Sequence, residues 1–225
     1  MKLWFASTDA DAVASAFRLG LFEGVLTNPT TLAAASRPPL DVIRDLCSAT
    51  TAPVFYQLAH DSADAMRAAA AGLLDHGWTN LGIKVPLTRA GCEVLHWLRE
   101  QKVALRLATA VTSVSPLLLA TALDVPWVTP SGSALEKLGG PSKLTLLTEM
   151  QAALDRQQSS TRLIPSLSSP GEMNALAAVG IRAGFIWDRD LARFVDHDLV
   201  SQTAASFEPA WSKLNATPAV ANLAY

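Results

Sequence analysis

Short apolar runs rich in β-branched and aromatic residues alternate along the chain with longer segments of helical periodicity. The runs predict eight strands, at residues 3–6, 24–27, 54–58, 81–85, 103–109, 127–129, 163–166 and 184–187. The segments between them predict helices over residues 8–19, 40–48, 63–74, 89–100, 116–123, 144–156 and 170–178, with another beginning at residue 191. Eight strand–helix units with no break in composition predict an α/β fold, a (β/α)8 TIM barrel. A doubly wound open sheet is the alternative.

The C-terminal end extends beyond the eighth unit. Residues 199–215 predict one additional C-terminal helix, and residues 216–225 predict a loose tail. Because the length of the chain suits one barrel, we expect residues 1–225 to form a single domain.

Composition excludes several classes of protein. Half of the residues are hydrophobic and 17% are charged, which is typical of a globular chain. The net charge is −2 and there is no basic run, so we expect no nucleic-acid partner. No apolar stretch reaches 18 residues and the N-terminus does not resemble a signal peptide, so we expect a cytoplasmic protein without a membrane span.

Motifs for metals and cofactors are absent from the sequence. The four histidines lack ligand spacing, and there is no GxGxxG or Walker loop, so we expect neither a metal nor a cofactor. Cys47 and Cys92 do not belong to a CxxC pair and are expected to be free thiols.

Lys84 is the most informative residue, because it lies inside the apolar strand at residues 81–85. Removing an ammonium from water costs several kcal/mol unless it is paired or loses its proton. A buried lysine with a lowered pKa is a neutral amine that attacks carbonyl carbons and forms a Schiff base. The alternative is a lysine that pairs with a carboxylate or extends to solvent.

Other polar residues lie at the ends of the predicted strands, where barrel enzymes carry their catalytic groups. They are Thr27 and Asn28, Gln57, Thr109 and Ser166. Each also has an ordinary structural interpretation. Asn28 fits a turn before Pro29, Gln57 or Thr109 fits a hydrogen-bonded core residue, and Ser166 fits a helix cap. Their convergence around a strand lysine favours a site at the mouth of the barrel.

The sequence resembles the small-subunit transaldolase family, most closely its fructose-6-phosphate aldolase type. The shared motifs are Gly24–Pro29, Phe55–Gln57, Ile83–Thr88, Thr109–Val111, Gly139-Gly140, Ser166 with Pro170, and Phe207–Trp211. The resemblance runs over nearly the whole chain in the same order. It implies a class I aldolase that makes or breaks a C–C bond between a small ketone or ketose donor and an aldehyde.

The resemblance also implies residue roles. Lys84 would form the Schiff base, Asn28 would hold a donor hydroxyl, Gln57 and Thr109 would hold a proton-shuttling water, and Ser166 would contact the donor. Thr27 and Ser131 would complete the substrate-binding set. A ring-shaped homo-oligomer such as a decamer is implied, with the segment around Phe207–Trp211 packed on a neighbouring subunit.

The chain departs from the family pattern at several positions. Ala6 replaces an aspartate, Leu26 a threonine, Ser131 a tyrosine, Ala134 an arginine and Ser168 a lysine. Because charge-assisted contacts to phosphate are strong, we expect a substrate other than the usual sugar phosphate. Lys137 and Arg189, on nearby loops, are candidates to replace the lost cations.

His60 follows the third strand and is a candidate for proton transfer, although it also fits an exposed residue at a helix start. Two other functions stay open. The departures fit a catalytically weak or inactive barrel with a binding or structural role. A Schiff-base enzyme with dehydration or condensation chemistry is the third interpretation.

Overall fold

The computed structural model describes residues 1–59 and 61–215. The chain divides into two compact units, Met1–Asp188 and a second unit that begins at Arg189. The expected tail, residues 216–225, lies outside the described residues, and the single-domain assignment stays a prediction.

Nine parallel strands of the described residues form one sheet in the first unit. They are β1 (Lys2–Ala6), β2 (Phe22–Leu26), β3 (Val54–Gln57), β4 (Leu81–Pro86), β5 (Arg106–Val111), β6 (Trp127–Pro130), β7 (Arg162–Leu163), β8 (Ser166–Leu167) and β9 (Ala183–Trp187). Their order in the sheet is β7-β6-β5-β4-β3-β2-β1-β9-β8. Each strand of the predicted set is therefore present, with one of them divided in two.

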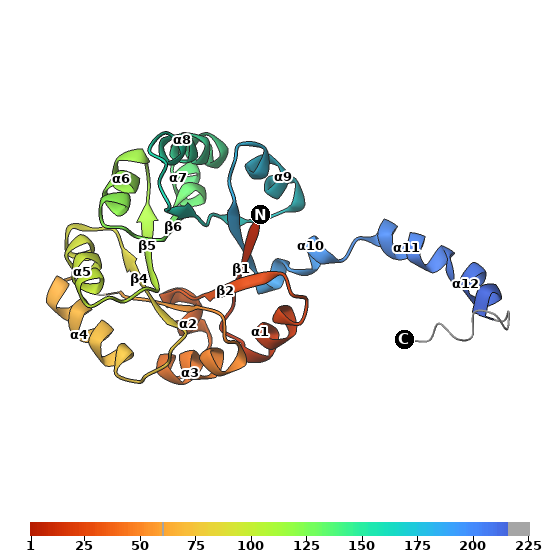
Figure 1. Cartoon of the computed structure of the whole chain (residues 1–225), viewed down its shortest axis with the longest axis horizontal. Coiled ribbons are helices and arrows are strands. Elements are labelled where there is room, and N and C mark those ends of the chain that lie inside the picture. The colour runs from red at the N-terminus through yellow and green to blue at the C-terminus, as the bar shows by residue number, and fades with distance from the viewer. Residues whose placement is uncertain (60, 216–225) are drawn as a thin grey trace. The chain divides into compact units, whose positions relative to one another are not determined.

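The divided strand closes the sheet into a barrel. β7 pairs with β6, and the Ile164 N–H donates to the Val128 carbonyl at 2.8 Å. β8 pairs with β9, and the Phe185 N–H donates to the Pro165 carbonyl at 2.8 Å. Because Pro165 has no N–H of its own, the ladder breaks there. The two halves nevertheless join both edges of the sheet, and the predicted (β/α)8 barrel is confirmed (Figure 1).

Helices surround the strands of the first unit (Figure 1). They are α1 (Ala10–Phe17), α2 (Pro29–Ala34), α3 (Pro39–Ala49), α4 (Ala63–Leu74), α5 (Arg89–Glu100), α6 (Val114–Ala122), α7 (Gly132–Lys137), α8 (Lys143–Arg156) and α9 (Pro170–Ala178). α4, α5 and α9 have the predicted bounds, since Ser62, Thr88 and Ser169 cap their first turns. The short helices α2 and α7 were not predicted, because six residues give too little periodicity to detect.

The second unit begins within the 3-10 turn at Asp188–Asp190 and contains α10 (Ala192–Val195), α11 (Asp198–Ser206) and α12 (Glu208–Asn215). The segment expected as one helix, residues 199–215, forms two helices that meet at Phe207. Pro209 explains the division: it lies in the first turn of α12, where its missing N–H is tolerated, whereas in a continuous helix the same residue would remove a backbone hydrogen bond.

None of the helices in the described part of the chain is long and apolar enough to cross a membrane. Cys47 and Cys92 are free thiols, and burial raises the pKa of Cys47 to about 11.

Three aromatic rings fill the centre of the barrel. Trp4, Phe55 and Trp127 contact one another with ring centroids 5.7 Å apart in each pair. We call these three side chains the aromatic layer. It fits because two strands carry glycine beside it: a Cβ on Gly24 would lie 2.2 Å from the Trp4 ring, and one on Gly82 would lie 2.5 Å from the Phe55 ring. Phe55 and Gly82 are paired in the register before Gln57 and Lys84, so the layer lies on the N-terminal side of Lys84.

Replacing Gly82 tests this packing. Gly82→Ala is expected to destabilise the protein by about 1–3 kcal/mol, because the added methyl overpacks the Phe55 ring. Gly72→Ala is the matched control: it lies in α4 with nothing within 4 Å of its Cβ position. It is expected to stabilise by up to about 1 kcal/mol through helix propensity. Urea unfolding measures both, and equal stability of the two variants would contradict the packing argument.

Candidate functional site

The carboxyl ends of the strands enclose a cavity of about 120 Å³ around Lys84. Its walls are Ala6, Leu26, Thr27, Asn28, Lys84, Thr109, Thr129, Pro130, Ser131, Ser166, Phe185 and Trp187. Six predicted site residues are therefore brought together: Thr27, Asn28, Lys84, Thr109, Ser131 and Ser166. The set comes from β2, β4, β5, β6 and β8 and the turns that follow them.

Lys84 is a buried amine without a carboxylate partner among the described residues that line this cavity. Only 7% of the residue is exposed, and its Nζ donates to the Thr27 carbonyl at 3.3 Å. Burial lowers the pKa of Lys84 to about 8. The shift from 10.5 corresponds to about 3 kcal/mol against the charged form. A neutral amine is thus accessible near neutral pH, and a neutral amine is a nucleophile.

Thr27 and Asn28 line the cavity together with Lys84, and local hydrogen bonds fix their positions. The Thr27 hydroxyl donates to the Phe55 carbonyl at 2.8 Å, so this side chain ties β2 to β3. Asn28 caps α2: its Oδ1 accepts from the Thr31 N–H at 2.9 Å, and Pro29 occupies the first turn. The cap fixes the Asn28 side chain at the cavity.

Thr109 lies next to a strained position in β5. Ala110 has φ of 62°, in the left-handed region, and the β5–β6 register shifts between Thr109 and Val111. A bulge of this kind redirects the flanking side chains and is frequent near functional sites. Beyond it, the Ser131 N–H donates to the Val111 carbonyl at 2.9 Å, which brings Ser131 to the cavity edge.

Gln57 lies beside Lys84 in the strand register but lines a different space. The two residues are paired between β3 and β4, yet Gln57 faces an adjoining cleft of about 660 Å³. Asp61, Arg89 and Glu93 also line that cleft, which is open to solvent. His60, the candidate for proton transfer, lies outside the described residues.

The substitutions noted in the sequence leave the cavity without a second charge among the described residues. Ala6 lines the wall where the resemblance implies an aspartate, whereas Ala134 and Lys137 are exposed on α7 and do not line the cavity. Arg189 belongs to the second unit, where it forms an ion pair with Asp190 at 3.8 Å. No group of three or more potential metal ligands occurs among the described residues.

A carboxylate does reach the strand ends near Ala6, from β9 rather than β1. Asp188 follows Trp187, the register partner of Ala6, and its Oδ2 accepts from the Ser7 hydroxyl at 2.9 Å. Ser7 in turn accepts from the Asp9 N–H at 3.1 Å. This contact ties the β1–α1 turn to the end of β9, and Asp188 is not among the residues lining the cavity.

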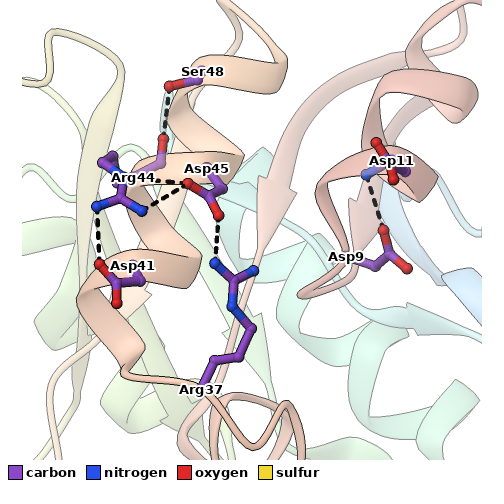
Figure 2. Close-up of polar contacts among 7 residues, drawn as sticks. All are labelled: Asp9, Asp11, Arg37, Asp41, Arg44, Asp45 and Ser48. Atoms are coloured by element: carbon purple, nitrogen blue, oxygen red, sulfur yellow. Dashed lines mark hydrogen bonds and ion pairs between the residues drawn. The ribbon is translucent and has the colours of Figure 1, made fainter.

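Another cleft with charged residues in its lining lies at the start of α1 and the α2–α3 loop. Figure 2 shows the polar contacts of the charged residues in this region. Arg37 reaches Asp45 at 2.6 Å, and Arg44 contacts both Asp45 and Asp41. The hydrogen bond from Arg37 lowers the pKa of Asp45. Asp9 caps α1: its Oδ1 accepts from the Asp11 N–H (Figure 2) and also from the Ala12 N–H. These charges are mutually paired and solvent-exposed, so they form a surface network.

Thr129 is a cavity residue that was missing from the sequence-based set. It is 5% exposed, and its hydroxyl has no hydrogen-bond partner among the described residues. It pairs with Thr109 across β5 and β6 and lines the Lys84 cavity. A buried hydroxyl without a partner is costly and points to a molecule that occupies the cavity. A threonine in an apolar strand is common, so the sequence carries no signal for this role.

The fold and cavity define a (β/α)8 barrel with a buried amine among hydroxyl and amide groups at the carboxyl ends of its strands. Two solved structures with TM-scores of 0.58 and 11% identity share the fold: a flavocytochrome b2 with sulfite bound, over 84% of this chain, and the orotidine 5′-monophosphate decarboxylase of Methanocaldococcus jannaschii, over 83%. The chain covers 57% and 87% of these structures, respectively. At this identity they show the barrel alone.

Curated proteins similar to this chain in sequence indicate which family of barrels it resembles. A probable transaldolase of Rhodospirillum centenum is 26% identical over 95% of this chain and 92% of its own length. One of Caulobacter vibrioides is 26% identical over 94% and 97%, and one of Bartonella bacilliformis is 27% identical over 95% and 97%. No family model matches the chain. The resemblance of this chain to the transaldolase family is confirmed.

Two threonines of the cavity give a matched test of hydrogen-bond satisfaction. Thr129→Val is expected to leave stability unchanged or raise it by about 1 kcal/mol, because it removes a hydroxyl without a partner. Thr27→Val removes a hydroxyl that donates to the Phe55 carbonyl, so it is expected to cost about 1 kcal/mol or more. Urea unfolding compares them. A loss for Thr129→Val as large as that for Thr27→Val would show that its hydroxyl has a structural partner.

Proposed function

We propose that this protein is a class I, Schiff-base aldolase or transaldolase-like enzyme. The Lys84 amine attacks the carbonyl of a small ketone or ketose donor, and the iminium that forms accepts electrons while a C–C bond to an aldehyde forms or breaks. The observation that carries the proposal is the burial of Lys84, with its pKa lowered to about 8, in a polar-walled cavity at the catalytic end of the barrel. The probable transaldolases among its relatives support the same chemistry.

The remaining roles follow the positions of the side chains. The Asn28 amide and the Ser166 hydroxyl line the cavity and hold the oxygens of the donor, with Thr27 forming the adjacent wall. Ser131, at the cavity edge, completes the substrate-binding set. Thr109 lines the cavity and holds the water that transfers protons, whereas Gln57, the second residue assigned to that water, faces the adjoining cleft. His60 is a further candidate for proton transfer. No cofactor is required by this chemistry.

The proposed donor is a small, uncharged ketone. A cavity of about 120 Å³ accommodates a three-carbon ketone, whereas a phosphate group would require a cation. Among the described residues of its lining, Lys84 is the one ionisable group, and a Schiff base consumes its amine. We therefore propose that the usual sugar phosphates are poor substrates.

Reductive trapping tests the nucleophile. Incubation with hydroxyacetone followed by borohydride is expected to attach the ketone to Lys84, located by mass spectrometry. The initial trapping rate is expected to rise between pH 7 and 9 with a midpoint about 8, because loss of the ammonium proton exposes the attacking lone pair.

Lys84→Met is the control and is expected to abolish the adduct. Absence of any adduct on Lys84 with hydroxyacetone, dihydroxyacetone or acetone would contradict the proposal.

One observation favours a second candidate. The described residues of the cavity lining include no carboxylate, which fits a catalytically weak or inactive barrel that binds a ligand. Trapping without turnover would support this function. Turnover to a dehydrated or condensed product would instead support the third interpretation, a Schiff-base enzyme with different downstream chemistry.

We further propose that the enzyme is a cytoplasmic homo-oligomer, such as a ring. Two free thiols fit a reducing compartment. In the second unit, α11 has no buried residue, and Phe207, Trp211 and Leu214 are 63%, 59% and 50% exposed. These three side chains are spaced like one face of a helix and line a cleft of about 380 Å³, so a second copy of the chain is the proposed occupant.

Sedimentation velocity tests this assembly. Phe207→Ser with Trp211→Ser is expected to lower the sedimentation coefficient toward that of a monomer, because the apolar face loses its two largest side chains. Leu138→Ser is the control, since Leu138 is 84% exposed in the first unit and is expected to leave assembly unchanged. A wild-type monomer, or an unaltered oligomer in the double variant, would contradict the proposal.

A further inference from the structure

A second buried lysine lies next to the cavity wall. Lys143 is the first residue of α8 and is 6% exposed. Its Nζ donates to the Ser166 carbonyl at 2.6 Å, to the Ser166 hydroxyl at 3.1 Å and to Glu172 Oε1 at 2.7 Å. An ammonium has three N–H donors, so each of them has a partner here.

The surroundings of Lys143 differ from those of Lys84. Lys143 has a carboxylate partner, whereas Lys84 has a single carbonyl. Burial tends to raise the pKa of Glu172, but hydrogen bonds from Lys143 and Ser168 outweigh it, so that the pKa lies below its ordinary value. Lys143 is therefore engaged in an ion pair with Glu172, a partner that Lys84 lacks.

Further hydrogen bonds and close packing surround the Lys143–Glu172 ion pair. The other carboxylate oxygen of Glu172 accepts from the Ser168 N–H at 2.6 Å and from its hydroxyl at 2.7 Å. On the opposite side, a Cβ on Gly132 would lie 2.9 Å from Lys143 Cγ. The lysine is thus confined by packing as well as by hydrogen bonds.

The contacts to Ser166 restrict how that residue meets a ligand. Lys143 occupies one lone pair of the hydroxyl oxygen and also binds the carbonyl of the same residue. The hydroxyl proton is then left to donate into the cavity that Ser166 lines. A hydroxyl that accepts a hydrogen bond from a cation is polarised and becomes a stronger donor.

We propose that Lys143 is a positioning residue that fixes Ser166 as a hydrogen-bond donor to the α-hydroxyl of the donor ketone. The inference rests on the proposed Schiff-base function and deepens it. It makes α-hydroxyketones the preferred donors over ketones without that oxygen. Lys143 acts through Ser166 and does not itself touch the ketone.

The ratio of two trapping rates tests the role of Lys143. Borohydride trapping on Lys84 is measured with hydroxyacetone and with acetone, which lacks the hydroxyl. Lys143→Met is expected to lower the hydroxyacetone-to-acetone rate ratio about tenfold, as is Ser166→Ala, because both weaken the same hydrogen bond. The combined variant Lys143→Met/Ser166→Ala is expected to lower it no further.

A purely structural role would lower both rates together and leave their ratio unchanged, and this result would overturn the inference. Lys143→Met leaves Glu172 without its cation, so Lys143→Met/Glu172→Gln serves as a second variant that removes both charges. The same fall in the ratio is expected from it.

The two proposals fail in different ways. An adduct on Lys84 of the wild type whose selectivity is insensitive to Lys143 would overturn this inference alone. Absence of any adduct in the wild type would overturn the proposed function and this inference with it.

Discussion

Exclusion of water from Lys84 is the constraint on which the rest of the site depends. The aromatic layer of Trp4, Phe55 and Trp127 fills the barrel on the N-terminal side of the lysine, and it packs there because Gly24 and Gly82 leave room for the rings. With the interior filled, the amine loses its hydration and its pKa falls. Core packing and chemical reactivity are thus two effects of one arrangement of side chains.

The two buried lysines show how partners decide the state of an amine. Lys84 and Lys143 are almost equally buried, at 7% and 6% exposure. Lys84 donates a hydrogen bond to the Thr27 carbonyl. Lys143 donates to the Glu172 carboxylate and to both oxygens of Ser166. Burial alone disfavours the ammonium, whereas a carboxylate within hydrogen-bond distance restores it. The same barrel can therefore hold, near one cavity, an amine without a carboxylate partner and an amine in an ion pair.

Much of the barrel was predictable from the sequence because its strands are buried and its helices are capped by Ser62, Thr88 and Ser169. Lys84 was predictable for the converse reason, as a charge within an apolar strand. Thr129 and Lys143 were not, because their roles arise from contacts between distant segments: a threonine facing a cavity, and a helix residue reaching Ser166. The orientation of Gln57 toward another cleft was likewise not predictable, because it depends on side-chain packing and not on the strand register that pairs it with Lys84.

The division of the seventh strand at Pro165 has a consequence for local dynamics. The ladders on either side of the break register only two residue pairs each, β6 with β7 and β8 with β9. Short strand ladders open locally at a lower free energy than the rest of a sheet. Ser166 is the first residue of β8 and follows Pro165 directly, so it lies in one of these short ladders. The Lys143–Glu172 pair ties the segment to the first turns of α8 and α9. The Lys143–Glu172 ion pair thus supplies a side-chain connection beside a part of the barrel that has few backbone hydrogen bonds of its own.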